Sequence, residues 1–193
     1  SKVFRNQVPT PVESLSDSKL LEFVTAGGYP DAIKRRGERR RQDWCRAYLK
    51  SIVERDLPDV AHIATPGRIP RLLEIAARFA GQLTNLSEIG RAVGLDHKTV
   101  DHYLRVLEQM YIVQRIQPWF RNELSRLIKT PKVHFIDSGL LTALRGYSVA
   151  RLRSDRSLLG PLLETFVFSE LLKMSAWGKE PVSLFHYRDK DQL

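Results

Sequence analysis

A group of polar and basic side chains lies on one side of an expected helix that begins near residue 97. Val100, Leu104, Leu107 and Tyr111 recur at spacings of four, three and four residues, which predicts an apolar stripe along one helix face. The polar residues between them then point away from that stripe. In a DNA-binding helix-turn-helix, the early residues of the second helix reach base edges in the major groove. The sequence therefore predicts nucleic-acid contacts from His97, Lys98, Thr99, His102 and Arg105.

A second group of cations follows in the polar segment 120–130, between two stretches that are rich in strand-forming residues. Arg121, Arg126 and Lys129 lie in this segment. A loop that joins two such strands beside a recognition helix commonly lies against the phosphate backbone, so these cations are expected to contact phosphate. The alternative, a winged helix that contacts no nucleic acid, also has support. Asp101 and Glu108 on the exposed side of the helix would repel phosphate, and many winged helices act as spacers or docking modules.

The elements that would position these residues form a winged helix over residues 61–137. Ser87 is a good N-cap for a first helix, and Gly94 supplies the left-handed residue that ends it. Asp96 can cap the second helix, which leads almost directly into a strand around Val113. An amphipathic helix from Gly67 to Ala80 is expected to pack beneath this pair.

The flanking regions have a different character. Residues 1–60 are expected to be a helical linker, with one helix from Gln42 that closes at Asp56 before Pro58. The basic run 34–46 fits either a phosphate-binding patch or a solvated connection between helices. Residues 138–193 are expected to form an α/β part, with a helix from 160 that is apolar nearly all round and therefore buried, and a strand at 182–187. The fold class is thus mostly α with an α/β C-terminal part.

Composition limits the remaining possibilities. The chain of 193 residues has a formal net charge of +9, which favours an acidic partner such as nucleic acid. No apolar run approaches the length needed to cross a bilayer, so no membrane association is expected. A single cysteine, Cys45, fits a reducing cytoplasm, and the scattered histidines lack the short spacings of a zinc site, so no metal is expected.

Six motifs occur in an order that is more specific than any one of them. The motifs are GGYPDAI at Gly27, AYLKSIVERD at Ala47, TVDHYLRVLEQMYIV at Thr99, KTPKVHFIDSGLL at Lys129, GPLLETFVFSEL at Gly160 and HYRDKDQL at His186. Together they resemble the C-terminal half, the domain of unknown function 4143 region, of prokaryotic AAA+-type ATP-binding proteins. The resemblance covers nearly the whole chain. It implies an N-terminal P-loop ATPase domain that is absent here, a winged helix, and a truncated unit similar to restriction endonucleases.

The resemblance also implies a helix glutamate that would hold a divalent cation in the endonuclease-like unit. Glu164 matches it by its place in GPLLETFVFSEL, and Glu170 fits less well. No catalytic set is complete, because the chain ends at Leu193, where the second carboxylate and a lysine are expected to follow. No phosphate-binding loop of the form G-x-x-x-x-G-K-[ST] occurs, so ATP and Mg²⁺ are expected only in the missing ATPase domain. This chain alone is expected to be neither an ATPase nor a nuclease.

Three hypotheses for function follow. The first is a DNA-binding regulatory portion of an AAA+-type protein, whose winged helix docks on duplex DNA. The second is a protein-interaction or dimerisation module that contacts the ATPase domain of the same chain or a second copy. The third is part of a metal-dependent nuclease-like domain, inactive as truncated.

Overall fold

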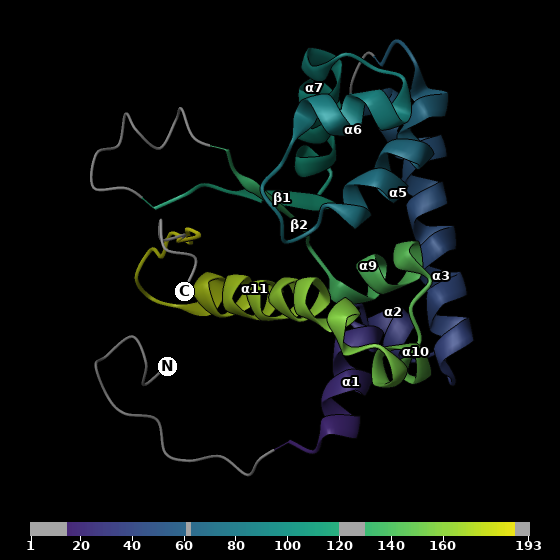
Figure 1. The fold of residues 1–193 in the computed structure, drawn as a ribbon, viewed down its shortest axis with the longest axis vertical. Coiled ribbons are helices and arrows are strands. Elements are labelled where there is room, and N and C mark those ends of the chain that lie inside the picture. Colours follow the sequence, from purple (N-terminus) through teal and green to yellow (C-terminus); the bar gives the residue numbers. More distant parts are fainter. Residues whose placement is uncertain (1–14, 61–62, 120–129, 188–193) are drawn as a thin grey trace.

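The computed structural model describes residues 15–60, 63–119 and 130–187, which are mostly helical with one small antiparallel sheet, as the sequence predicts. In Figure 1, α5, α6 and α7 lie at one end of the molecule, and α1, α2, α9 and α10 lie at the other, with the strands between them. The helices are α1 (Asp17–Ala26), α2 (Pro30–Ile33), α3 (Glu38–Ser51), α4 (Leu57–Val60), α5 (Ile69–Arg78), α6 (Leu86–Val93), α7 (His97–Gln109), α9 (Ser138–Arg145), α10 (Val149–Ser154) and α11 (Leu159–Trp177), and the strands are β1 (Val113–Ile116) and β2 (Lys132–Phe135).

The predicted order of helix, tight turn, helix and strand is present in α6, α7 and β1. Gly94 ends α6 in the left-handed conformation, with φ of 74°, and Asp96 caps α7 by accepting hydrogen bonds from the N–H groups of Lys98 and Thr99. The predicted cap at Ser87 is wrong. Asn85 caps α6 instead, since its side chain accepts from the N–H of Glu88, and Ser87 lies inside the helix.

The apolar stripe of α7 is confirmed at its first three positions and wrong at the fourth. Val100, Leu104 and Leu107 are fully buried, and Tyr103 joins them with its hydroxyl bonded to Thr65. Tyr111 is exposed, because the chain leaves the helix at Met110 and passes through a turn in which Tyr111 has φ of +54°. The helical spacing therefore no longer applies to it.

The sheet lies directly after α7. β1 and β2 pair antiparallel, with Val113 opposite Phe135 and Ile116 opposite Lys132. On the other edge of β2, Leu83 forms an antiparallel bridge with Lys132, and the N–H of Gly81 donates to the carbonyl of Val133. The segment between α5 and α6 is thus tied to β2, which fixes the helices against the strands.

Helix α9 connects the two ends of the molecule, since it packs on α1, α3, α5 and α11. Its N-cap, Asp137, accepts from the N–H of Leu140 at 3.0 Å and from the N–H of Gly28 at 2.6 Å. The motif GGYPDAI and the motif KTPKVHFIDSGLL are therefore in contact, through Gly28 and Asp137. Burial raises the pKa of Asp137 above its ordinary value, although the N–H groups that it accepts from act in the opposite direction.

One hydrophobic core runs from Leu21 to Leu162, across the predicted boundaries at 60 and 137, and that division stays a prediction.

The predicted end of the long helix before Pro58 is wrong. Helix α3 passes into a π-helical turn at Ile52–Asp56, and α4 continues to Val60 (Figure 1). Pro58 is the second residue of α4, and the N–H of Leu57 just before it donates to the carbonyl of Ile52, five residues back, in the π-helical turn. The chain thus accommodates the proline by widening the preceding turn rather than by stopping.

Helix α11 is not buried on all sides, which corrects the prediction from its composition. Leu162, Thr165 and Phe168 are buried, because one face packs on β2 and α9. The opposite face is open, and Figure 1 shows the helix projecting from the α9–α10 end beneath the strands. Its exposed apolar residues are Val167, Leu171, Met174 and Trp177.

The predicted strand at 182–187 is absent from the described residues. A single parallel bridge joins His186 to Pro118, with the His186 N–H donating to the Gln117 carbonyl at 3.0 Å and the Trp119 N–H donating to the His186 carbonyl at 2.7 Å. The alternating apolar residues indicated a strand, but the segment pairs over one position only and the residues around it are largely exposed.

Within 15–60, 63–119 and 130–187, none of the helices could cross a membrane.

Candidate nucleic-acid interface

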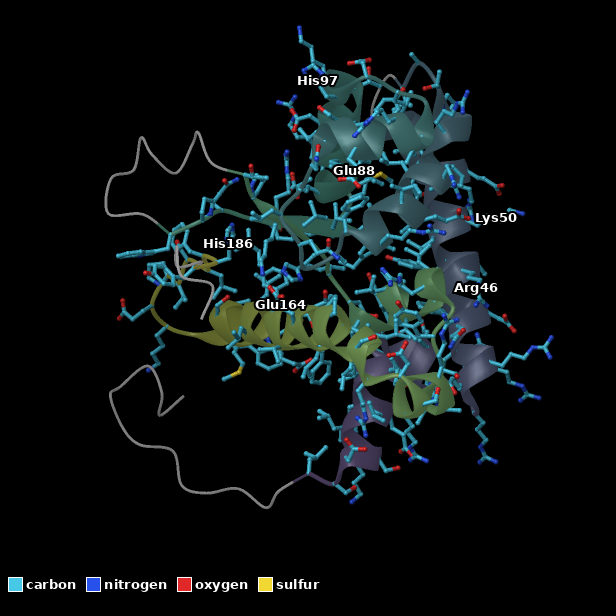
Figure 2. All side chains as sticks on the ribbon, viewed as in Figure 1. Arg46, Lys50, Glu88, His97, Glu164 and His186 are labelled. Atoms are coloured by element: carbon cyan, nitrogen blue, oxygen red, sulfur yellow. The ribbon has the colours of Figure 1, made fainter. Side chains whose placement is uncertain are left out.

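The outer face of α7 carries the predicted base-contacting residues. His97, Lys98, His102 and Arg105 are exposed, as the apolar stripe on the other side of the helix requires. Figure 2 shows His97 at the free end of this helix, pointing away from the rest of the molecule. Thr99 differs from the others, because it is half-buried and its hydroxyl donates to Asp96 Oδ2 at 2.5 Å. Thr99 therefore completes the helix cap and is less available to a ligand.

The acidic residues of α7 are neutralised by a strand residue. The guanidinium of Arg115 on β1 lies 2.6 Å from Asp101 Oδ1 and 2.6 Å from Glu108 Oε2. Its Nε also donates to Glu108 Oε2 at 2.7 Å, and its backbone N–H donates to Glu108 Oε1 at 2.7 Å. Burial tends to lower the pKa of Arg115, but the hydrogen bonds from its guanidinium to Glu108 and Asp101 raise it above the ordinary value.

Arg105 belongs to the same network, because its guanidinium lies 2.7 Å from Asp101 Oδ2. The two arginines and the two carboxylates of this network cancel in charge. The repulsion of phosphate that Asp101 and Glu108 suggest in the sequence is therefore balanced within the fold. Arg115 was missed at the level of sequence, although a cation two residues into a strand, after a helix with acidic residues at 101 and 108, was a usable signal.

Two exposed cations near this end of the molecule are not part of the network. Lys98 on α7 and Arg91 in the last turn of α6 have no ion-pair partner among the described residues. Asp96, the nearest carboxylate in sequence, accepts three hydrogen bonds at the cap of α7, and the bonds from Thr99 lower its pKa. The predicted wing cations Arg121, Arg126 and Lys129 lie outside the described residues.

The candidate carboxylates of α11 both have partners. Glu164 lies on the side of α11 that faces the strands (Figure 2), with Oε1 2.6 Å from Lys132 Nζ and 3.5 Å from His134 Nε2. Burial tends to raise the pKa of Glu164, but the hydrogen bonds from His134 and Lys132 outweigh it and lower the pKa. Glu170 pairs with Lys173 on its own helix.

His134, interpreted from the sequence as filling a sheet position, is fully buried on β2. Its Nδ1 lies 3.0 Å from the hydroxyl of Thr165, and its ring lies against Phe168 with centroids 5.0 Å apart. These contacts attach α11 to the sheet. Within the described ranges, no group of three or more histidine, cysteine, aspartate or glutamate side chains could hold a metal ion. Glu164 thus connects α11 to β2 through Lys132 and His134, whereas Glu170 pairs only within its own helix.

Comparison with known proteins gives a family for these elements. A family model described as "Domain of unknown function (DUF8612)" matches residues 17–151, which is more than half of the chain. The chain belongs to this family. The DUF8612 match includes α7, β1 and β2 and ends within α10, so Glu164 lies beyond it.

Longer relatives match over almost the whole chain. The uncharacterized protein Rv2008c of Mycobacterium tuberculosis and the uncharacterized protein Mb2031c of Mycobacterium bovis are each 29% identical over 178 residues. The alignment covers 92% of this chain and 39% of each relative, so the chain spans less than half the length of the relatives it matches. No solved structure matches the chain.

Proposed function

We propose that α5, α6, α7, β1 and β2 form a winged helix that docks on duplex DNA, within the C-terminal portion of an AAA+-type ATP-binding protein. The arrangement supports the winged-helix assignment, because a helix pair joined by a tight turn is followed by two antiparallel strands. The bridge from Leu83 to β2 adds a short third strand position between α5 and α6. In DNA-binding helix-turn-helix proteins the second helix lies in the major groove. That role falls to α7.

The balanced charge of α7 is the observation that carries this proposal. Arg115 and Arg105 compensate Asp101 and Glu108, whereas Lys98, beside two exposed histidines on the outer face, has no ion-pair partner in the part of the chain that the structure describes. Histidine and lysine side chains can donate hydrogen bonds to base edges and to phosphate oxygens. The formal net charge of +9 also favours approach to a polyanion.

The proposal is tested by the salt dependence of binding to a labelled random-sequence duplex, measured by fluorescence anisotropy. We expect Lys98→Gln to weaken binding and to reduce the slope of log affinity against log salt by about 1, because one phosphate contact is lost. The matched control is Lys50→Gln, which removes the same charge from α3, at a distance from His97 in Figure 2. The docking model is wrong if both variants bind alike, or if the parent chain shows no binding at about 50 mM salt.

The exposed face of α11 favours a second candidate function, a protein-interaction or dimerisation module. Val167, Leu171 and Met174 follow one another at four and three residues and are exposed together with Trp177. Contiguous exposed apolar surface marks interaction sites in soluble proteins. Light scattering over a concentration series distinguishes the two functions. Association that Leu171→Glu abolishes, with no affinity for DNA, supports the interaction module over DNA docking.

The nuclease-like alternative rests on Glu164 alone. Its carboxylate is held by Lys132 at 2.6 Å, so a metal ion would have to displace that lysine. The decisive comparison uses a longer chain that continues beyond residue 193, assayed for Mg²⁺-dependent DNA cleavage with and without Glu164→Gln. Cleavage that this substitution abolishes supports the alternative, and cleavage that persists excludes Glu164 from the reaction.

A further inference from the structure

A hollow of about 370 Å³ lies where the end of α5, the end of α9 and the start of α10 come together. Its wall contains three arginines, Arg78, Arg145 and Arg151, one from each of these helices, and the side chain of Tyr147. Glu74 and Leu144 complete the lining. None of these residues belongs to α7, so this hollow is separate from the proposed DNA-docking face.

The arginine at the base of the hollow is held in place by the fold. Arg145 is half-buried, donates one hydrogen bond to the carbonyl of Ala77 at 3.1 Å and donates another to the hydroxyl of Tyr147. The guanidiniums of Arg145 and Arg151 also lie 4.9 Å and 5.4 Å from the centre of the Tyr147 ring. Buried Tyr147 therefore orders two of the three cations before any ligand arrives.

The charge of this hollow is not balanced from within. No carboxylate among the described residues lies within ion-pair distance of Arg78, Arg145 or Arg151, and Glu74 pairs with Arg71 at 3.0 Å. Other arginines close by in the sequence have partners, since Arg153 bonds to Ser18 and Arg156 to Asp17. Converging like charges destabilise a fold unless an anion lies between them. An arrangement of guanidiniums with free N–H groups matches the oxygens of a phosphate.

An apolar groove of about 380 Å³ adjoins the hollow and shares Leu144 and Glu74 with it. Leu49, Val53 and Leu73 form much of its lining, and Arg46 and Lys50 on α3, labelled in Figure 2, also border it. A site with an apolar half and a cationic half suits a ligand with the same two halves. Pockets of this size and character are typical of small-molecule sites.

We propose that the hollow binds the phosphate group of a small phosphate ester, whose apolar part lies in the adjoining groove. The phosphate contacts Arg78 and Arg151 at the rim and Arg145 at the base. A small ligand is favoured over a nucleic-acid backbone because Arg145 is only partly exposed, so the phosphate must enter the hollow to reach it. The site lies within the residues that define the DUF8612 family, with Arg151 as the last matched position.

The test is isothermal titration calorimetry of the whole chain with two probes. Phenyl phosphate has an apolar ring and a phosphate group, and inorganic phosphate has the phosphate group alone. We expect phenyl phosphate to bind more tightly than inorganic phosphate. We also expect Arg78→Gln and Arg151→Gln each to weaken both by about tenfold or more, because each removes a charge-assisted hydrogen bond. Both side chains are exposed, so the variants should fold, and circular dichroism checks this. Arg153→Gln is the matched control, since it removes the same charge from α10 at a side chain that does not line the hollow.

Three outcomes overturn the phosphate site, and a fourth overturns its apolar half. One is that neither probe binds at millimolar concentration. Another is that Arg78→Gln and Arg151→Gln bind phenyl phosphate as well as Arg153→Gln does. The last is that these two variants lose affinity for a labelled duplex while the parent chain binds no phenyl phosphate, which would make the arginines backbone contacts for DNA. Equal affinity for the two probes overturns the assignment of the apolar groove.

Discussion

Removing the charge of Arg115 should destabilise the fold far more than removing the charge of Arg105, although both pair with Asp101. Arg115 is only 17% exposed at its side chain and bonds two carboxylates, whereas Arg105 is 59% exposed and bonds one. Arg115→Met keeps the aliphatic stem but leaves Glu108, itself 19% exposed, without its guanidinium partner. Charge-assisted hydrogen bonds contribute about 1.5–3 kcal/mol each, and Glu108 retains its bond from the backbone N–H of residue 115.

From these contacts we expect Arg115→Met to lower the free energy of unfolding by about 3 kcal/mol. That loss corresponds to a fall in Tm of roughly 6–12 °C for a domain of this size. Arg105→Met should cost less than about 0.5 kcal/mol, because solvent screens an exposed pair. Urea denaturation followed by circular dichroism measures both values under one set of conditions.

A double-mutant cycle with Asp101→Asn isolates the pair from other effects of the substitution. Asp101→Asn combined with Arg115→Met should cost less than the sum of the single changes, with a coupling of about 1 kcal/mol or more. If Arg115→Met and Arg105→Met lower stability by the same small amount, the network does not hold α7 against β1. The acidic residues of α7 would then not be neutralised within the fold.

Two further predictions concern the packing of α1 and α11. Gly27→Ala should lower the free energy of unfolding by about 2–4 kcal/mol in urea denaturation, because Gly27 has φ of +70° and a Cβ atom there would lie 2.3 Å from Asp137 Oδ1. Gly67→Ala, in the turn before α5, where a Cβ atom would meet nothing within 4 Å, should instead add about 0.4–1 kcal/mol, so equal losses would refute the reasoning. The lowered pKa of Glu164 means that its contribution is present above the ordinary glutamate pKa and is lost as pH falls through the lowered value. The difference in Tm between the parent chain and Glu164→Gln should therefore be largest near neutral pH and should shrink once the pH falls below the ordinary glutamate pKa of 4.5, and a difference independent of pH would contradict the role of the charge.

Local signals in the sequence predicted the helices well where one residue fixes one backbone feature. Gly94 and Asp96 determine the turn between α6 and α7 through their own conformation and hydrogen bonds, so they could be read directly. The cap of α6 was misassigned because Asn85 and Ser87 are both good N-cap residues two positions apart. A local signal separates them, because Glu88 stands three residues after Asn85, as in a capping box, whereas Gly90 stands three residues after Ser87.

Contacts between distant segments could not be predicted in the same way. The composition of α11 is apolar on every side, but burial depends on which faces meet another element, and only the face with Leu162 and Phe168 does. The neutralisation of Asp101 and Glu108 depends on the position at which Arg115 crosses them after the turn at Tyr111. On α7 taken alone those carboxylates lie on the solvent-facing side, but in the fold they face a strand.

The charged clusters of this chain separate into two kinds, and the difference bears on function. Around Arg115 the fold supplies as many carboxylates as guanidiniums at 2.6–2.7 Å, so the cluster is complete without a ligand and its role is to hold α7 against β1. Around Tyr147 the fold brings together guanidiniums from α5, α9 and α10 and supplies no carboxylate at ion-pair distance among the described residues. A cluster that is balanced internally loses stability when one member is removed. A cluster that is not balanced should gain stability when one member is removed and lose ligand affinity instead. Arg115→Met and Arg151→Gln should therefore shift the Tm of the ligand-free chain in opposite directions.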